Sequence, residues 1–355
     1  MANPNKKARK HLTPQRLTAF LTGLALPLCL IVVWRLAYGQ QEAVLAPQVQ
    51  MSAPAVQTTV AAPSREEHKQ EPKQEPAPDP GEELSRMREF FQAMVRQPTI
   101  ERLDHYKKLW AKSPKISQIM EERRLRLNRL DKSYLEFVRG DVKTEMAKAG
   151  LSFEASQYFL YADRNPQTQI VIVGFYDAPK DAIEFLGADL ISSGNLDRGG
   201  DYFVTPVGVF ENSLDNFSYR ALGTPNQEGW RGLGAKDSRV WDFGFQKSLK
   251  KYKEGNTVSQ MRLLMHSTDP DKGEPRLGRI DSKGCIRISQ GLNRFLDNFA
   301  ILDQEYEGWA KTKPDSWLLK KDRQPVIYPG KYLIVGDSSQ RQSAAKGLAT
   351  ARASN

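Results

Sequence analysis

The chain contains few residues of the kinds that build disulfides, metal sites and redox centres. Only two cysteines, Cys29 and Cys285, and four histidines occur among its 355 residues. Two cysteines exclude a scaffold held together by several disulfides. Residues 151–355 hold one cysteine and one histidine, which are too few nitrogen and sulfur ligands for a metal centre. We therefore expect no metal and no other cofactor.

The middle of the chain lacks an excess of positive charge, although the whole chain has one. The sequence has 52 Lys and Arg against 42 Asp and Glu, a formal net charge of +10. Five basic residues lie within residues 1–16 and three within residues 339–355, and neither segment has an acidic residue. A nucleic-acid-binding domain needs a basic surface on its folded part. The sequence therefore argues against nucleic acid as a partner.

One long apolar run lies near the N-terminus. Hydrophobic residues make up only 39 % of the chain, which excludes a multi-span membrane protein. Residues 17–34 are nevertheless uncharged and largely apolar, and a helix of that length spans about 27 Å, close to the thickness of a bilayer core. The basic tail at residues 1–16 places the N-terminus in the cytoplasm. We predict a transmembrane anchor or a cleaved signal segment at residues 17–38.

Two segments separate this run from the C-terminal part of the chain. Residues 39–80 are rich in Pro, Gln, Ala and Glu, so we predict a disordered linker that cannot bury enough apolar surface to fold. Residues 81–150 carry apolar residues at helical spacing, which predicts a helical segment. We expect Pro98 to end its first helix and one long helix to run from Pro114 to Phe137. The charged face of this segment is either solvated or a surface for a partner protein.

From residue 155 the pattern changes to β-strands. The runs Tyr158–Ala162 and Gln169–Phe175 flank a turn signal and predict a hairpin. Helical spacing returns at residues 290–310. We therefore expect a mainly β domain with few helices at residues 155–337, followed by a disordered tail at residues 338–355.

The cysteine and the histidine of this domain form a candidate nucleophile and base. A predicted strand at Arg262–Met265 leads to His266, and Cys285 follows 19 residues later in a glycine-containing loop. In a Cys–His pair the imidazole removes the thiol proton and the thiolate attacks a carbonyl. Lys283 and Arg287 are cations close to the cysteine, and nearby positive charge favours the thiolate. The other interpretation is that both side chains lie in a core and never meet.

Several short motifs occur in a fixed order around this pair. They are Ser193-Gly194, Thr205-Pro206-Val207-Gly208-Val209-Phe210, His266-Ser267-Thr268, Leu277-Gly278 and Ser282-Lys283-Gly284-Cys285-Ile286-Arg287. In this order they resemble the L,D-transpeptidase (YkuD) family of peptidoglycan cross-linking enzymes. The resemblance covers residues 155–337 and implies a β-sandwich-type catalytic domain.

The resemblance also implies an activity and a set of roles. Cys285, deprotonated by His266, would attack the third residue of a peptidoglycan stem peptide, release D-alanine and form a thioester. The amine of a second stem peptide would then resolve the thioester and cross-link two third-position diamino acids. The Ser267 carbonyl would orient the imidazole, and the N–H groups of Gly284 and Cys285 would hold the oxyanion. The residues expected to contact substrate are Arg287, Lys283 and Ser282, with bracing of the loop as the other role open to Arg287.

One departure from the family pattern leaves alternatives open. The family carries a second histidine two residues before the cysteine, where this chain has Lys283. With water as the acceptor the protein would be an L,D-carboxypeptidase or a hydrolase of the same fold, and without activity it would be a cell-wall binding or scaffold module. A papain-like or caspase-like protease does not fit, because papain-like enzymes place Cys before His and caspases separate the pair further.

The resemblance implies a place in the bacterial cell envelope. The catalytic domain would lie in the periplasm, attached to the inner membrane through residues 17–38 or released by cleavage of a signal peptide. Its partners would be peptidoglycan stem peptides. The sequence leaves three roles open for the segment 81–150: bracing the catalytic domain, gating its cleft or binding an envelope protein.

Overall fold

The computed structural model describes residues 79–128, 130–252, 255–313 and 317–339. The predicted basic tail, the predicted membrane segment and nearly all of the predicted linker lie outside these residues. Within them, no helix combines the length and the apolar character that a membrane crossing needs. Two predicted boundaries shift, because Pro80 begins the first described helix and Ser338 is buried in the folded part.

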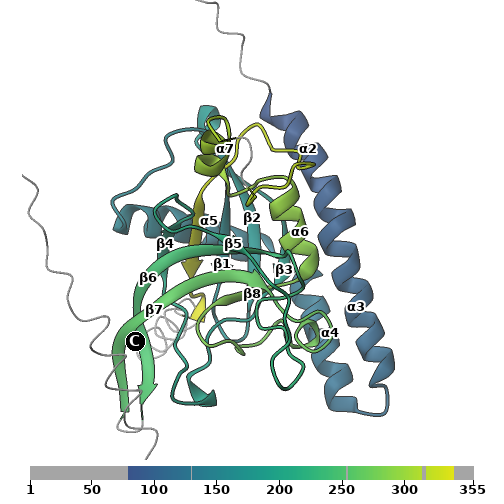
Figure 1. Cartoon of the computed structure of the whole chain (residues 1–355). Coiled ribbons are helices and arrows are strands. Elements are labelled where there is room, and N and C mark those ends of the chain that lie inside the picture. The colour runs from purple at the N-terminus through teal and green to yellow at the C-terminus, as the bar shows by residue number, and fades with distance from the viewer. Residues whose placement is uncertain (1–78, 129, 253–254, 314–316, 340–355) are drawn as a thin grey trace, which may run out of the picture. The chain divides into compact units, whose positions relative to one another are not determined.

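The N-terminal part of the described chain is helical, as its apolar periodicity predicts. The helices are α2 (Pro80–Phe91), α3 (Gln97–Leu109), α4 (Pro114–Asn128) and α5 (Lys132–Lys148), and a π-helical turn, η1 (Gln92–Arg96), joins α2 to α3. Figure 1 shows α2 and α3 in line along one side of the sheets, with α4 next to α3.

The prediction that Pro98 ends the first helix is wrong, because the helix continues into α3. Proline lacks the N–H that would bond four residues back, and its ring crowds that carbonyl, which belongs to Met94. The π-helical turn η1 widens the backbone just before the proline and removes the conflict. A Cβ on Gly291 of α6 (Gln290–Asn298) would approach the Met94 carbonyl oxygen to 2.6 Å. The displaced carbonyl therefore packs against a glycine.

The single long helix predicted from Pro114 to Phe137 is in fact two helices. α4 ends at Asn128, and Asp131 begins α5 as its N-cap, with Oδ1 accepting the Tyr134 N–H at 2.7 Å. The periodicity does not reveal the break, because both helices turn their apolar faces to the same core.

Two mixed sheets follow the helices. Sheet 1 has the strand order β3-β2-β1-β9-β4 and sheet 2 the order β5-β6-β7-β8. The strands of sheet 1 are β1 (Gln157–Asp163), β2 (Ile170–Asp177), β3 (Ala182–Leu190), β4 (Gly208–Glu211) and β9 (Tyr332–Gly336). Those of sheet 2 are β5 (Tyr219–Arg220), β6 (Arg239–Tyr252), β7 (Gly255–Ser267) and β8 (Ile286–Ile288). The predicted hairpin of β1 and β2 is confirmed, and the predicted helical stretch 290–310 consists of α6 and α7 (Gln304–Ala310).

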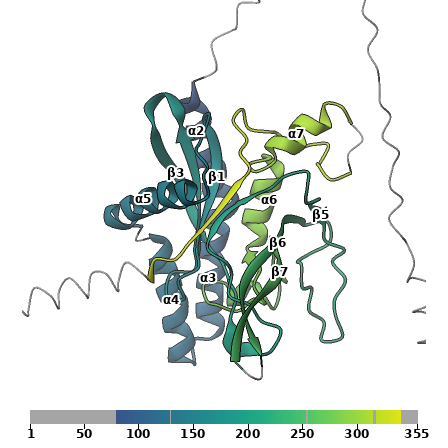
Figure 2. The ribbon, with the colours of Figure 1, turned by 90° about the vertical axis from the view of Figure 1, so that its left-hand side faces the viewer.

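Sheet 1 is covered on both faces. Along β1, Tyr158 and Leu160 face one core, while Phe159 and Tyr161 face another. Helices α3, α4 and α5 close the second core, and sheet 2 closes the first together with α2 and α6. Figure 2 shows α5 on one side of β1 and β3, with α6, β6 and β7 on the other side.

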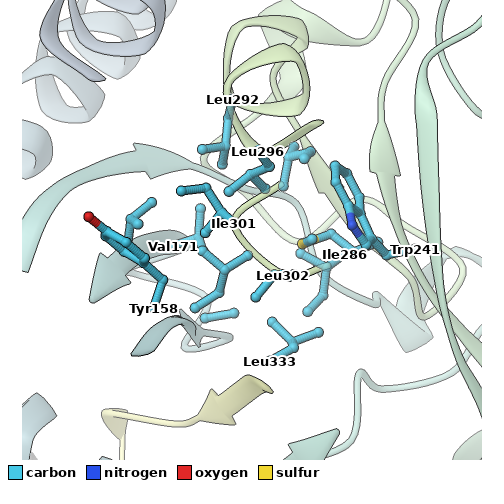
Figure 3. Packing of buried hydrophobic residues seen from close by; sticks show 14 of the residues in the cluster. Tyr158, Val171, Trp241, Ile286, Leu292, Leu296, Ile301, Leu302 and Leu333 are labelled. Carbon is cyan, nitrogen blue, oxygen red and sulfur yellow. The ribbon is translucent and has the colours of Figure 1, made fainter. Parts of the chain in front are cut away.

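The core between the two sheets forms the base of the candidate site. Trp241 of β6, Ile286 of β8 and Leu292 of α6 are completely buried, and Figure 3 shows them opposite Val171 of sheet 1. Burying each large apolar side chain contributes about 1.5–3 kcal/mol. Because Trp241 and Ile286 point inward, the alternate residues of β6 and β8 point to the outer face of sheet 2.

The helical segment and the sheets share their cores. Leu84, Met87 and Phe91 of α2 lie in the same apolar cluster as Trp241 and Ile286. The boundary that we predicted between residues 150 and 155 is therefore a change of secondary structure and does not divide the packing.

Candidate active site

The outer face of sheet 2 brings His266 and Cys285 together. β7 and β8 run parallel, with His266 paired to Arg287 and Met265 paired to Ile286. Met265 and Ile286 point into the core, so His266 and Arg287 point outward. Cys285, one residue before β8, lies on the same face by alternation. The imidazole and the thiol are thus diagonal neighbours on adjacent strands, which argues against two separate core positions.

His266 is a neutral base in a fixed orientation. Its side chain is 3 % exposed, and Nδ1 lies 2.7 Å from the Ser267 carbonyl oxygen, the contact that the resemblance implies. Because a carbonyl only accepts hydrogen bonds, Nδ1 carries the proton and Nε2 carries the lone pair. Burial lowers the pKa of His266 to about 4, with the Arg287 cation acting in the same direction and the Ser267 carbonyl opposing both.

Cys285 is a protonated thiol at neutral pH. The residue is partly exposed, yet the protein atoms around the sulfur raise the pKa of the thiol by burial, against the opposing effects of the Leu264 N–H and the Arg287 cation. Arg287 thus favours the thiolate, as the sequence predicts, but burial has the larger effect on the pKa of the thiol. Lys283 lies with its Nζ 5.6 Å from the centroid of the Tyr202 ring. Among the described residues no hydrogen bond joins Cys285 to His266.

Ser282 shapes the turn before the cysteine. Its Oγ accepts the Gly284 N–H at 3.0 Å and donates to the Cys285 carbonyl at 2.6 Å. We predicted that Ser282 contacts substrate. The side chain is instead completely buried and holds the turn. The Gly284 N–H is used by this bond and is not free for an oxyanion. Of the two predicted donors, the Cys285 N–H is left.

Gly284 is required by the fold itself. Its φ of 130° is one that residues with a side chain rarely adopt, and a Cβ would lie 2.8 Å from Met261 Cε. Met261 therefore occupies the space that a side chain at this position would need. Thr205 Oγ1 donates to the Gly284 carbonyl at 2.7 Å and accepts the Gly194 N–H at 2.9 Å. Two motifs far from Cys285 in the sequence thus fix the cysteine turn.

Asp281 lies among four arginines on one side of this turn. Arg276 binds its carboxylate through Nε at 2.6 Å and Nη2 at 2.7 Å, and Arg198 donates to it as well. Arg287 and Arg279 approach the carboxylate to 3.6 Å and 3.8 Å. Arg287 also donates to the Asp281 carbonyl at 3.1 Å, so bracing of the loop is the role for which the structure supplies contacts.

Helix α4 holds the loop that joins the candidate base to the candidate nucleophile. Arg123 donates to the Pro275 carbonyl at 2.7 Å, and Arg126 donates to the Gly278 carbonyl at 2.8 Å. Arg123 is buried, and burial lowers its pKa to about 10, so it stays charged at neutral pH. The helical segment, for which the sequence showed no chemistry, thus fixes the loop of the site.

Sequence reasoning missed three polar residues near Cys285. Asp242 of β6 is buried and pairs with Arg262 of β7 at 2.5 Å. Burial, Asp242 and Cys285 raise the pKa of Tyr219 on β5, so its hydroxyl keeps its proton and can donate a hydrogen bond. No motif marks these residues. They are found only through the strand pairing, in which Asp242 lies opposite Leu264.

No group of three or more His, Cys, Asp or Glu side chains in the described part of the chain is placed to hold a metal ion.

Comparisons of the sequence with models of known protein families and with curated proteins give no match. The likeness to L,D-transpeptidases therefore depends on the motif residues and on their arrangement.

Proposed function

We propose that the protein is a cysteine-dependent L,D-transpeptidase that acts on peptidoglycan stem peptides in the bacterial periplasm. The observation that supports this most directly is the pair formed by His266 and Cys285 on the outer face of sheet 2. The Ser267 carbonyl fixes Nδ1 of the imidazole, so Nε2 is the atom that accepts the thiol proton.

In the acylation step, the sulfur of Cys285 attacks the carbonyl carbon of the third residue while His266 Nε2 takes the thiol proton. The bond to the D-alanine nitrogen then breaks, and the imidazolium returns the proton to that nitrogen. A thioester remains on Cys285 and D-alanine leaves. Both groups start neutral, so no charged pair has to form before the substrate binds.

In the second step, the side-chain amine of another stem peptide attacks the thioester carbon and gives its proton to His266. The carbon–sulfur bond breaks and the imidazolium reprotonates Cys285. The product is a peptide bond between two third-position residues. The cleaved bond supplies the energy, so the reaction needs no nucleotide.

The developing oxyanion needs donors on the same face. The Cys285 N–H is one of them, and removal of one such donor costs about 3–4 kcal/mol in comparable sites. Tyr219 is the candidate for a second donor, because burial, Asp242 and Cys285 raise the pKa of its hydroxyl, which therefore keeps its proton.

The experiment is incubation of the purified protein with disaccharide-tetrapeptides, followed by mass spectrometry. Dimers linked through two third residues and free D-alanine are expected. Cys285→Ser should form no product, and His266→Gln should be at least about a hundredfold slower. The exposed His105 offers the matched control, since His105→Gln should behave as wild type. Trimmed tripeptides without dimers would identify water as the acceptor, and a folded protein that forms no thioester would refute the proposal.

A further inference from the structure

The four arginines around Asp281 carry more positive charge than this carboxylate balances. Arg198, Arg276, Arg279 and Arg287 all approach one carboxylate, whose side chain is 4 % exposed. Four cations and one anion leave a local excess of about three charges. Burial lowers the pKa of Arg279 and of Arg287, the Asp281 carboxylate opposes this shift, and repulsion from Arg276 adds to it. A second anion at this place would relieve the repulsion.

Most hydrogen-bond donors of this arginine cluster are not used by Asp281. A guanidinium has five N–H donors, so four of them offer about twenty. The described residues show four bonds to Asp281, three to its carboxylate and one to its main-chain carbonyl. The side chains of Arg198 and Arg279 are 39 % and 49 % exposed, so a ligand can reach them from solvent.

The arginine cluster lies beside the candidate nucleophile. Arg287 and Cys285 share the outer face of sheet 2, two residues or about 7 Å apart along the chain. Trp230 bounds the cluster, since Arg276 and Arg287 lie 5.5 Å and 5.9 Å from the centroid of its ring. An anion bound here is therefore close to a peptide whose carbonyl is at the sulfur.

We propose that the arginine cluster is a subsite for a carboxylate of the peptide that reacts at Cys285, and that it selects acidic peptides. The identity of the peptide rests on the proposed function. Arg276 grips Asp281 through two parallel bonds, the geometry in which a guanidinium recognises a planar carboxylate. A stem peptide that ends in D-alanine brings such a carboxylate to the site.

The test measures binding without turnover, on the full chain with Cys285→Ser. The probes are a synthetic stem tetrapeptide with free carboxylates and the same peptide with every carboxylate converted to an amide, titrated by calorimetry. Amidation should weaken binding about tenfold or more. Arg279 is the residue to change, because it touches Asp281 only at 3.8 Å and its loss spares the tighter contacts. Arg279→Ala should raise the Kd of the acidic peptide about three- to tenfold and leave that of the amide unchanged.

Two further variants sharpen the test. Arg279→Lys keeps the charge and should recover part of the affinity. Arg88 forms a single exposed pair with Glu184, so Arg88→Ala is the matched control and should bind both peptides as the parent does.

Equal affinity for the two peptides, or an unchanged Kd in Arg279→Ala, would overturn the subsite. Tighter binding of an anionic phosphate polymer than of the acidic peptide would overturn it as well. A failure of the proposed function gives a different result from a failure of the subsite. The acidic peptide would then still bind in an arginine-dependent manner, but wild-type Cys285 would form no thioester.

Discussion

Burial moves the pKa values of His266 and Cys285 in opposite directions. It lowers the pKa of the imidazole to about 4 and raises that of the thiol. A thiolate–imidazolium pair requires the reverse order, in which the thiol ionises before the imidazole loses its proton. Between these two pKa values both side chains are neutral. In the proposed reaction the imidazole would therefore take the thiol proton as the carbonyl is attacked, as in general-base catalysis.

The pH dependence of thiol reactivity tests this arrangement. We expect the rate at which iodoacetamide alkylates Cys285 to rise with pH and to reach its plateau only above pH 9, since the thiol pKa lies above its ordinary value. Turnover should fall on acidification only near pH 4, where His266 takes up a proton and can no longer act as the base. Mass spectrometry of the Cys285 peptide gives the first profile and product formation the second. An alkylation plateau already present at pH 6 would indicate a standing thiolate and contradict the neutral pair.

At the scale of elements, the sequence predicts what depends on local pattern. The hairpin of β1 and β2, the strand that leads to His266 and the start of α4 at Pro114 are all found as expected. The continuation of the helix through Pro98 is not predicted by the sequence. It depends on a glycine of α6, almost 200 residues away, which leaves room for a carbonyl of the π-helical turn. Long-range packing of this kind leaves no local signal.

The candidate site, too, is predictable from the sequence only in part. Cys285 and His266 are predictable from motif residues and from their scarcity in the sequence. The partners that set their chemistry are not, because strand register brings Asp242 near the sulfur and helix packing brings Arg126 to the loop. The burial that keeps the thiol protonated is likewise a property of the assembled sheet.

The contact between α4 and the loop gives a prediction at this scale. Arg126 donates to the Gly278 carbonyl at 2.8 Å and to the Thr168 carbonyl at 3.3 Å. In Arg126→Ala we expect kcat to fall about tenfold with little change in KM, because the loop loses a charged hydrogen bond of about 1.5–3 kcal/mol and the cysteine turn loosens. Steady-state kinetics with stem peptides measures the two constants separately.

A neighbour on the same helix supplies the control. Among the described residues Arg124 makes longer ion pairs, at 3.8 Å to Asp104 and 3.6 Å to Glu121, so Arg124→Ala should leave kcat unchanged. Arg126→Lys, which keeps one donor, should recover part of the rate. A rise in KM alone, or equal losses in Arg124→Ala and Arg126→Ala, would show that α4 does not position the loop.

At the scale of the whole described fold, the helices and the sheets are stabilised by common cores. α2 supplies Leu84, Met87 and Phe91 to the core beneath sheet 2. The ring of Phe91 meets that of Phe295 edge to face, with centroids 5.4 Å apart. The inner face of sheet 2 packs on this core, and its outer face holds the candidate site. Unfolding of α2 should therefore disrupt the core and the site together.

Phe91→Ala therefore tests whether the helical segment belongs to the same cooperative fold as the candidate site. The change removes a buried aromatic ring and should lower the free energy of unfolding by about 3–5 kcal/mol, whereas Leu109→Ala, at a side chain 63 % exposed, should lower it by less than about 0.5 kcal/mol. Thermal melts of Phe91→Ala followed by circular dichroism and by Cys285 labelling should show the helical signal and the native labelling rate of Cys285 lost in one transition. If the helices melt first while Cys285 keeps its native labelling rate, the segment is an independent attachment and the shared core does not support the site.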